Sequence, residues 1–307
     1  MRKEKTKYRW YVRMICGVLV FAMILVGLSF GGKSNPTINR LLTKMHIINQ
    51  RCGTGLGGFS FINVGNGDAC CVYNNQVVGL IDTGTREKSG EIIQYLHSLK
   101  TDTLDFVVLS HLHTDHAGGY LNILKEFTIK TLYVLPYDDN DFEHLALYQQ
   151  IIQQSKQQGT DIVTVSHQRV ENYDGISLTF YDFTWCATEE NQKSLVVSVT
   201  IGEKRCLFMG DAGEHIESQI MYLPNIGQTD ILKVAHHGSK DATSQLFLSA
   251  VSPTYSVVSV GVNNYGHPSP ETLERLNKQK CKIFRTDICR YVLLAIDETN
   301  EVIVQVQ

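Results

Sequence analysis

From Phe59 to the C-terminus the sequence alternates between short runs rich in β-branched residues and longer stretches with helical periodicity. Some neighbouring runs are joined by turns of hairpin length, such as residues 74–76 and 202–204, which connect antiparallel strands. Other runs are joined by helical segments, the usual crossovers between parallel strands. Because both connections occur, the sequence predicts an α/β (α+β) fold with mixed sheets and helices on their outer faces.

The composition is that of a folded protein with one sizeable core. The chain has 307 residues, of which 43% are hydrophobic and 19% charged, which excludes a disordered chain and a multi-span membrane protein. No internal repeat or low-complexity tract interrupts the alternation. We therefore expect a single folded domain over residues 58–307.

A basic segment and an apolar segment precede this domain. Residues 1–13 hold six Lys or Arg and one Glu, and residues 14–30 hold no charge. At ~1.5 Å per residue the apolar run spans about 25 Å, the short limit for a membrane helix. By the positive-inside rule the start of the chain stays in the cytoplasm and the body is exported. We expect residues 1–31 to be a single-pass anchor in the cell membrane, 32–57 a linker, and the domain extracellular.

A cleaved signal peptide would also have a basic start and an apolar run, and it would make the body a secreted protein. Residues 29–32 (SFGG) form a poor cleavage site, which favours the anchor.

The net charge of −3 divides unevenly, because residues 1–13 carry +5 and the remainder carries −8. An acidic body argues against bulk electrostatic binding of nucleic acid.

Histidine and aspartate cluster after the predicted strand Phe106–Ser110, where residues 111–119 read HLHTDHAGG. In a loop at a strand end, imidazoles and a carboxylate at this spacing can converge on one or two ions, and the glycines let the backbone approach. These ligands suit Zn, Mn or Fe. A solvated polar loop is the alternative, and the density of ligand-type residues disfavours it.

Two further predicted strands end in ligand-type residues. One is followed by Asp211, and the other by His236 and His237. Alone, such an Asp is usually a helix N-cap and such a His a structural residue. Together with residues 111–119, they indicate a metal site built from three strand ends at one edge of the sheets.

These segments resemble the metallo-β-lactamase superfamily and, within it, the β-lactamase-like domain of ComEC-type DNA-uptake proteins, over about residues 59–296. The resemblance implies an αβ/βα four-layer sandwich and metal-assisted hydrolysis with one or two divalent ions, Zn or Mn. It is carried by FINVGNGDA (61–69), LIDTG (80–84), HLHTDHAGG (111–119), NxxSLVV (191–197), MGD (209–211), LKVAHHGS (232–239), NYGHPSP (264–270) and RTD (285–287).

The roles of two single residues follow from their chemistry and position. Asp115 is expected to bind metal or act as general base, and His267 to assist at the phosphate, because it precedes a predicted helix whose N-terminus supplies free N–H donors. Many members of the superfamily have a further histidine near positions 191–194, and its absence here is expected to leave the first metal position weak or empty. The expected ligands are His111, His113, Asp115, His116, Asp211 and one of His236 and His237; the expected orienting residues are Asp68 and Asp82; and the candidate substrate contacts are Asn191, Ser194, Ser239, Lys240 and Asn264.

The predicted function is a membrane-anchored extracellular hydrolase of phosphodiesters, with DNA as the leading substrate. A cell-surface phosphoesterase acting on teichoic-acid-like or nucleotide substrates is an alternative that the acidic body favours. A non-catalytic anchored binding subunit with a vestigial metal site is another. The fold alone does not choose among these substrates.

Overall fold

We describe a computed structural model of the chain, which covers residues 55–136, 144–187, 190–223, 226–227 and 229–307. The predicted membrane segment 14–30 and the linker up to residue 54 lie outside these residues. Within the described ranges, no helix is long and apolar enough to cross a membrane. The first strand begins at Gly55, so the last residues of the predicted linker belong to the folded domain.

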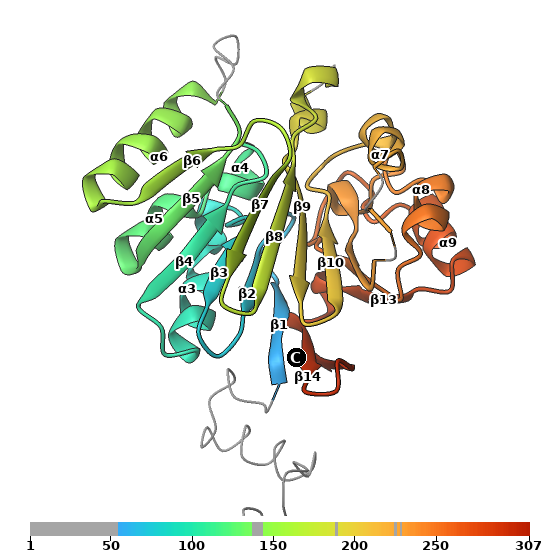
Figure 1. Cartoon of the computed structure of the whole chain (residues 1–307). Coiled ribbons are helices and arrows are strands. Elements are labelled where there is room, and N and C mark those ends of the chain that lie inside the picture. The colour runs from blue at the N-terminus through green and yellow to red at the C-terminus, as the bar shows by residue number, and fades with distance from the viewer. Residues whose placement is uncertain (1–54, 137–143, 188–189, 224–225, 228) are drawn as a thin grey trace, which may run out of the picture. The chain divides into compact units, whose positions relative to one another are not determined.

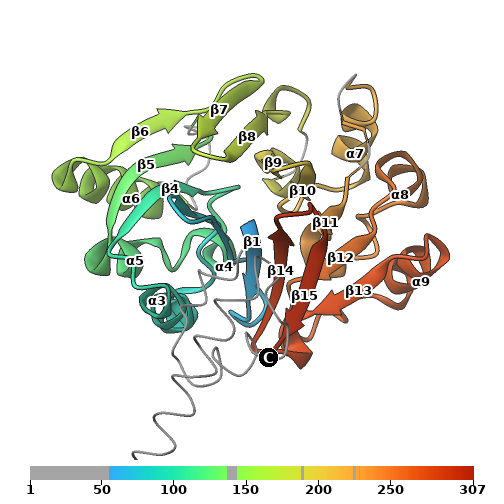
Figure 2. The same cartoon turned by 60° about the horizontal axis from the view of Figure 1, so that its bottom comes forward.

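The first of two mixed sheets has eight strands in the order β15-β14-β1-β2-β3-β4-β5-β6. Neighbours from β15 to β3 pair antiparallel, and neighbours from β3 to β6 pair parallel. The C-terminal strands β14 and β15 thus return beside the N-terminal β1 (Figure 2). The bounds are β1 Gly55–Ile62, β2 Cys70–Tyr73, β3 Val78–Ile81, β4 Thr103–Val108, β5 Thr128–Val134, β6 Asp161–Thr164, β14 Tyr291–Asp297 and β15 Val302–Val306.

The second sheet has seven strands in the order β13-β12-β11-β10-β9-β8-β7. Its strands β10 to β13 pair parallel, whereas β7 to β10 pair antiparallel. Short turns join β7 to β8 and β9 to β10, and a longer connection joins β8 to β9. The bounds are β7 Arg169–Tyr173, β8 Ile176–Tyr181, β9 Val196–Ile201, β10 Lys204–Phe208, β11 Ile231–Lys233, β12 Tyr255–Val258 and β13 Lys282–Arg285.

Helices cover the outer face of each sheet (Figure 1). Helices α3, α5 and α6 pack on the first sheet, and α7, α8 and α9 on the second, so the layers run helix, sheet, sheet, helix. Short 3-10 turns and the one-turn helix α4 lie in the connections. The bounds are α3 Ser89–Ser98, α4 Thr114–Ala117, α5 Tyr120–Glu126, α6 Leu145–Gln158, α7 Glu214–Ile220, α8 Gln245–Val251, α9 Pro270–Lys278, η1 Arg86–Lys88, η2 Thr184–Cys186, η3 Glu190–Lys193, η4 Ala235–Gly238 and η5 Thr286–Ile288.

Strand β4 shows why the strand sequences read as continuous apolar runs. Phe106 and Val108 point into the core between the two sheets, whereas Val107 and Leu109 point into the core beneath the helices. Successive side chains of a strand face opposite sides, so a strand covered on both sides needs apolar residues at every position. The same alternation occurs in β10, where Cys206 and Leu207 enter different cores.

The predicted fold of two mixed sheets with outer helices is confirmed. The sequence pattern predicts no strand over residues 169–173, where the structure has the edge strand β7, because RVENY is polar and mostly exposed and lacks the apolar signal. The pattern predicts a helix over residues 142–158, and α6 begins at Leu145 within that range; residues 142–143 lie outside the described ranges.

Gly79 in β3 provides a test of this packing. A Cβ atom there would collide with the ring of Phe106 on the neighbouring strand, so we expect Gly79→Val to lower the free energy of unfolding by about 1–3 kcal/mol. In α3, Gly90 has nothing within 4 Å of its Cβ position, and Gly90→Ala should raise stability by up to about 1 kcal/mol. Urea unfolding followed by circular dichroism measures both, and equal stability of the two variants would contradict the packing described.

Candidate metal centre

The expected ligands meet at one edge of the molecule because five strands end there. Strands β3 and β4 of the first sheet run parallel, as do β10, β11 and β12 of the second. Their carboxyl ends lead into loops, which is where open α/β sheets place their functional residues. The loops carry Asp82, His111 to His116, Asp211, His236 with His237, and Asn264 with His267.

Three buried imidazoles are oriented through their Nδ1 atoms. His116 Nδ1 lies 2.8 Å from Asp82 Oδ2, His237 Nδ1 donates to the carbonyl of Ser259 at 2.9 Å, and His111 Nδ1 lies 3.0 Å from Ser110 Oγ. This arrangement leaves Nε2 of each ring directed toward the centre. Orienting a ligand imidazole through its other nitrogen is a regular feature of metal sites.

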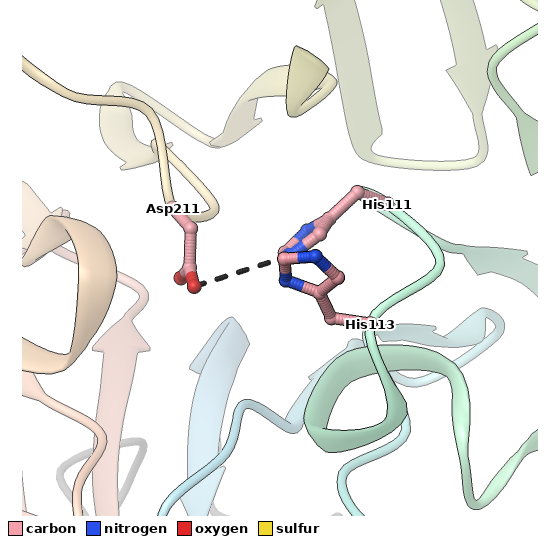
Figure 3. Close-up of side chains that lie close together, drawn as sticks. All are labelled: His111, His113 and Asp211. Carbon is pink, nitrogen blue, oxygen red and sulfur yellow. Dashed lines mark ion pairs between the residues drawn. The ribbon is translucent and has the colours of Figure 1, made fainter. Parts of the chain in front are cut away.

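The carboxylate of Asp211 lies among the imidazoles, opposite His111 and His113 in Figure 3. Its Oδ1 is 3.2 Å from His116 Nε2 and 3.7 Å from His237 Nε2. Its Oδ2 is 4.0 Å from His111 Nε2 and 3.8 Å from His236 Nε2. One carboxylate therefore faces imidazoles on both sides, as a group that bridges two ions would.

Several buried polar atoms of the centre make ion pairs with one another but no hydrogen bond. Within the described part of the chain these atoms include Nε2 of His111, His116 and His237 and Oδ1 of Asp211. Unsatisfied buried polar atoms are costly, and four that converge fit a bound cation. Among the described residues, ligand atoms within 4.8 Å of one another form four groups. Two of them are His111–His113–Asp211, called the first position here, and Asp115–His116–His237, called the second; the other two, Asp68–Asp82–His116 and Asp68–Asp211–His237, both contain Asp68.

His236 and His237 differ in their surroundings. His237 is buried and its Nε2 lies 3.2 Å from Asp115 Oδ2, which places it in the second position. The side chain of His236 is 30% exposed, and its Nε2 lies 3.3 Å from the amide nitrogen of Asn191. His236 Nε2 and His111 Nε2 both face Oδ2 of Asp211, so His236 lies on the side of the first position.

Asp68 contacts two imidazoles and forms a buried ion pair with Lys233. Its Oδ1 lies 3.4 Å from His237 Nδ1, and its Oδ2 lies 3.7 Å from His116 Nδ1. Burial acts to raise the pKa of Asp68, but the charges of Lys233 and His116 outweigh it and lower this pKa to about 2. Asp68 is therefore ionised at neutral pH and orients both rings.

The carboxylates stabilise positive charge at the centre. Burial opposes charge on His116 and His237, but Asp211 and the neighbouring carboxylates raise the pKa of His116 well above its usual value and that of His237 to about 9. Burial lowers the pKa of His111 well below its usual range. The pKa of Asp211 is held well below its usual value despite burial, because His116 and His237 are beside it. A divalent ion would displace the protons on these imidazoles.

Backbone strain coincides with the site. Asp82, His236 and His237 have positive φ values of 58°, 48° and 52°, a region that non-glycine residues rarely adopt. Gly67 is required by close packing and not by a positive φ, since a Cβ atom there would lie 2.5 Å from the carbonyl oxygen of Asp115. This close approach lets Asp68 N–H donate to the same carbonyl at 3.0 Å.

The expected substrate contacts separate into buried and exposed residues. Ser194 and Ser239 are buried. Ser194 Oγ accepts from Asp211 N–H at 3.0 Å, and Ser239 Oγ accepts from Asp241 N–H at 3.3 Å, so both serine hydroxyls hold loops of the site in place. By contrast, Asn191 and His267 are half-buried beside His236, and Lys240 and Asn264 are exposed.

Three residues at the centre were not anticipated. Ser110 donates to Asp82 Oδ2 at 2.8 Å and so connects two ligand loops. Lys233 is buried. A lysine within an apolar strand sequence indicates that a buried acidic residue compensates its charge, so the sequence could have pointed to this residue. His144 has its ring 5.0 Å from that of His113, and no motif marks it in the sequence.

Comparison with known proteins agrees with this geometry. Residues 71–262 match the metallo-beta-lactamase superfamily. ComE operon protein 3 of Bacillus subtilis (strain 168) is 29% identical over 262 residues, covering 77% of this chain and 32% of the relative. Recombination protein 2 of Haemophilus influenzae is 29% identical over 233 residues, covering 74% of this chain and 27% of the relative. The chain thus spans about a third or less of these relatives.

A solved structure shows the same fold. The metallo-beta-lactamase fold protein YhfI from Bacillus subtilis superposes with a TM-score of 0.53 and 11% identity, covering 82% of this chain and 100% of that one. This likeness concerns the fold alone, whereas the family match includes the ligand loops after β4, β10 and β11. The chain belongs to the metallo-β-lactamase superfamily and, within it, is similar to ComEC-type competence proteins.

Proposed function

We propose that this protein is a metal-dependent phosphodiesterase, a ComEC-like nuclease that acts on DNA outside the cell membrane. The observation that carries the proposal is the set of converging, buried ligand atoms around Asp211, which make ion pairs but no hydrogen bonds among the described residues. Similarity to ComEC-type proteins supports a nucleic-acid substrate. The basic and apolar residues 1–30 support a membrane anchor with the domain outside.

The residues present fit one or two divalent ions, Zn or Mn. The second position offers Asp115, His116 and His237, and the first offers His111 and His113. Asp211 lies between the two positions. His236 faces the Asp211 oxygen that His111 also faces, and we propose that it completes the first position. Imidazole and carboxylate ligands suit both metals.

A bound divalent ion supplies Lewis-acid polarisation of a phosphate oxygen and makes water acidic enough to attack near neutral pH. The protein residues orient and exchange protons around that chemistry. Asp68 and Asp82 keep the Nε2 atoms of His116 and His237 directed at the centre. Asp115 has a side chain that is 27% exposed, and its carboxylate is placed to bind an ion or to accept a proton from the attacking water.

His267 is proposed to hold the substrate phosphate. Its ring lies 5.5 Å from that of His236 and is half-buried at the open side of the centre. Burial lowers the pKa of His267 below its usual value, so near pH 7 it is mainly neutral and acts as a hydrogen-bond donor to a phosphate oxygen. Lys240 and Asn264 are exposed and provide further phosphate contacts.

A cell-surface phosphoesterase is the second candidate. The net charge of −8 after residue 13 weakens general attraction to DNA, which favours smaller or polyol phosphodiesters such as teichoic-acid-like polymers. A third candidate, a non-catalytic binding subunit, requires a centre that holds no ion. Metal analysis and a substrate panel separate the three.

The full chain, purified in detergent, should contain two ions by elemental analysis after loading with Mn or Zn. Because His237 is in the second position, His237→Ala should remove one ion and lower phosphodiesterase activity at least about 100-fold. His236→Ala should weaken only the ion of the first position. His97→Ala, which changes an exposed histidine on α3, is the matched control. Loss of no ion in His237→Ala would overturn the ligand assignment, and a wild type without metal would favour the binding subunit.

Removal of one hydrogen-bond donor that stabilises a transition state costs about 10²–10³ in kcat. We expect His267→Ala to lower kcat on single-stranded DNA by about that factor, with metal content unchanged, and His267→Gln to recover part of the loss because its amide also donates. The same assays on double-stranded DNA and a glycerol phosphodiester identify the substrate class. Cleavage of the glycerol phosphodiester alone would reject the nuclease in favour of the second candidate.

A further inference from the structure

Tyr265 is the outermost of four neighbouring aromatic rings that begin in the metal centre. Ring centroids are 6.2 Å apart for His237 and His236, 5.5 Å for His236 and His267, and 5.8 Å for His267 and Tyr265. Exposure rises in the same order, since His237 is buried, His236 and His267 are half-buried, and Tyr265 is 77% exposed. These rings connect the centre with the protein surface.

The loop that carries Tyr265 is held by the side chain of Asn263. Its Oδ1 accepts from the backbone N–H groups of Tyr265 and His267, both at 3.0 Å. Its Nδ2 donates to the carbonyls of Gly261 and His267, both at 2.8 Å. Both ends of the amide are engaged, so the loop presents the tyrosine ring in a defined place. An aromatic ring on a preorganised loop loses little conformational entropy when it binds a ligand.

The same loop also exposes an aliphatic side chain. Val262 on the same loop is fully exposed. Single exposed apolar residues are ordinary, but here an exposed ring and an exposed aliphatic side chain share one fixed loop beside the proposed phosphate contact His267. The chain is acidic after residue 13, so charge attraction contributes little to holding a nucleic acid. Stacking of a base on an aromatic ring needs no basic surface and tolerates any base sequence.

We propose that Tyr265 positions the substrate by stacking on an unpaired nucleobase next to the phosphodiester held by His267. This inference rests on the proposed phosphodiesterase function and assigns it a substrate class, single-stranded nucleic acid, because only an unpaired base offers its face to a side chain. Tyr265 takes no part in bond breaking. By binding the base, Tyr265 determines which phosphodiester group of the substrate lies at the metal centre.

The test compares two substrates that share a backbone. One is an oligothymidylate and the other is an oligomer of the same length whose nucleotides are abasic. With the full chain loaded with Mn, Tyr265→Ala should lower kcat/KM on the oligothymidylate by about tenfold, mainly through KM, and should affect the abasic oligomer far less. Tyr265→Phe keeps the ring and should keep the preference. Tyr222→Ala changes a tyrosine that is 84% exposed after α7 and should leave both activities unchanged.

A binding measurement separates this inference from the proposed function. The fluorescence of 2-aminopurine in a single-stranded oligonucleotide is quenched by stacking, and it can be followed with protein that holds no metal. We expect quenching by wild type and Tyr265→Phe and little by Tyr265→Ala. Equal quenching by wild type and Tyr265→Ala, or equal loss of cleavage on both substrates, would overturn the role of Tyr265 while leaving the phosphodiesterase proposal intact. Quenching without any cleavage would instead reject the proposed function.

Discussion

The buried carboxylate of Asp211 is the group on which the site depends. It lies between imidazoles contributed by both sheets, and its two oxygens face the first and second positions separately. Burying such a carboxylate is costly unless positive charge surrounds it. The protein supplies part of that charge through His116 and His237, whose other ring nitrogens are held by Asp82 and Ser259. The geometry favours occupation by a divalent cation.

This electrostatic requirement explains features around the centre. Lys233 is buried because Asp68, which orients two imidazoles, needs a compensating charge. The strained backbone at His236 and His237 turns two successive histidines in different directions, one into the second position and the other toward the first. A regular strand would also separate neighbouring side chains, but onto opposite faces of the sheet. The left-handed turn keeps both at the same edge.

The proposed substrate contacts extend this arrangement outward. His267 borders the metal centre and Tyr265 borders the solvent, and one asparagine side chain holds the loop that carries both. The two proposals together place the phosphate contact and the base contact on one loop, two residues apart. Changes in that loop would then alter specificity without disturbing the ligands on the neighbouring loops.

The prediction of the fold succeeded where local signals were strong. Apolar runs mark the strands that are covered on both sides, and helical periodicity marks the helices. The pattern predicts helices over residues 120–126 and 270–279, and the structure has α5 over Tyr120–Glu126 and α9 over Pro270–Lys278. Strand β7 was missed because an exposed edge strand needs no apolar pattern. His144 and Ser110 were missed because a single polar residue carries no spacing signal, and only the folded chain places them beside His113 and Asp82.

The sequence was sufficient to identify the alternation of strands and helices, the ligand-type residues at three strand ends, and the family to which the chain belongs. These depend on local patterns and on motif order, which are written along the chain. It left open which of His236 and His237 belongs with Asp115. The tertiary structure decided this point, since it places His237 Nε2 3.2 Å from Asp115 Oδ2. Burial, ring orientation and hydrogen-bond partners, such as those of Ser194 and Ser239, arise only when loops from two separate sheets meet at one edge.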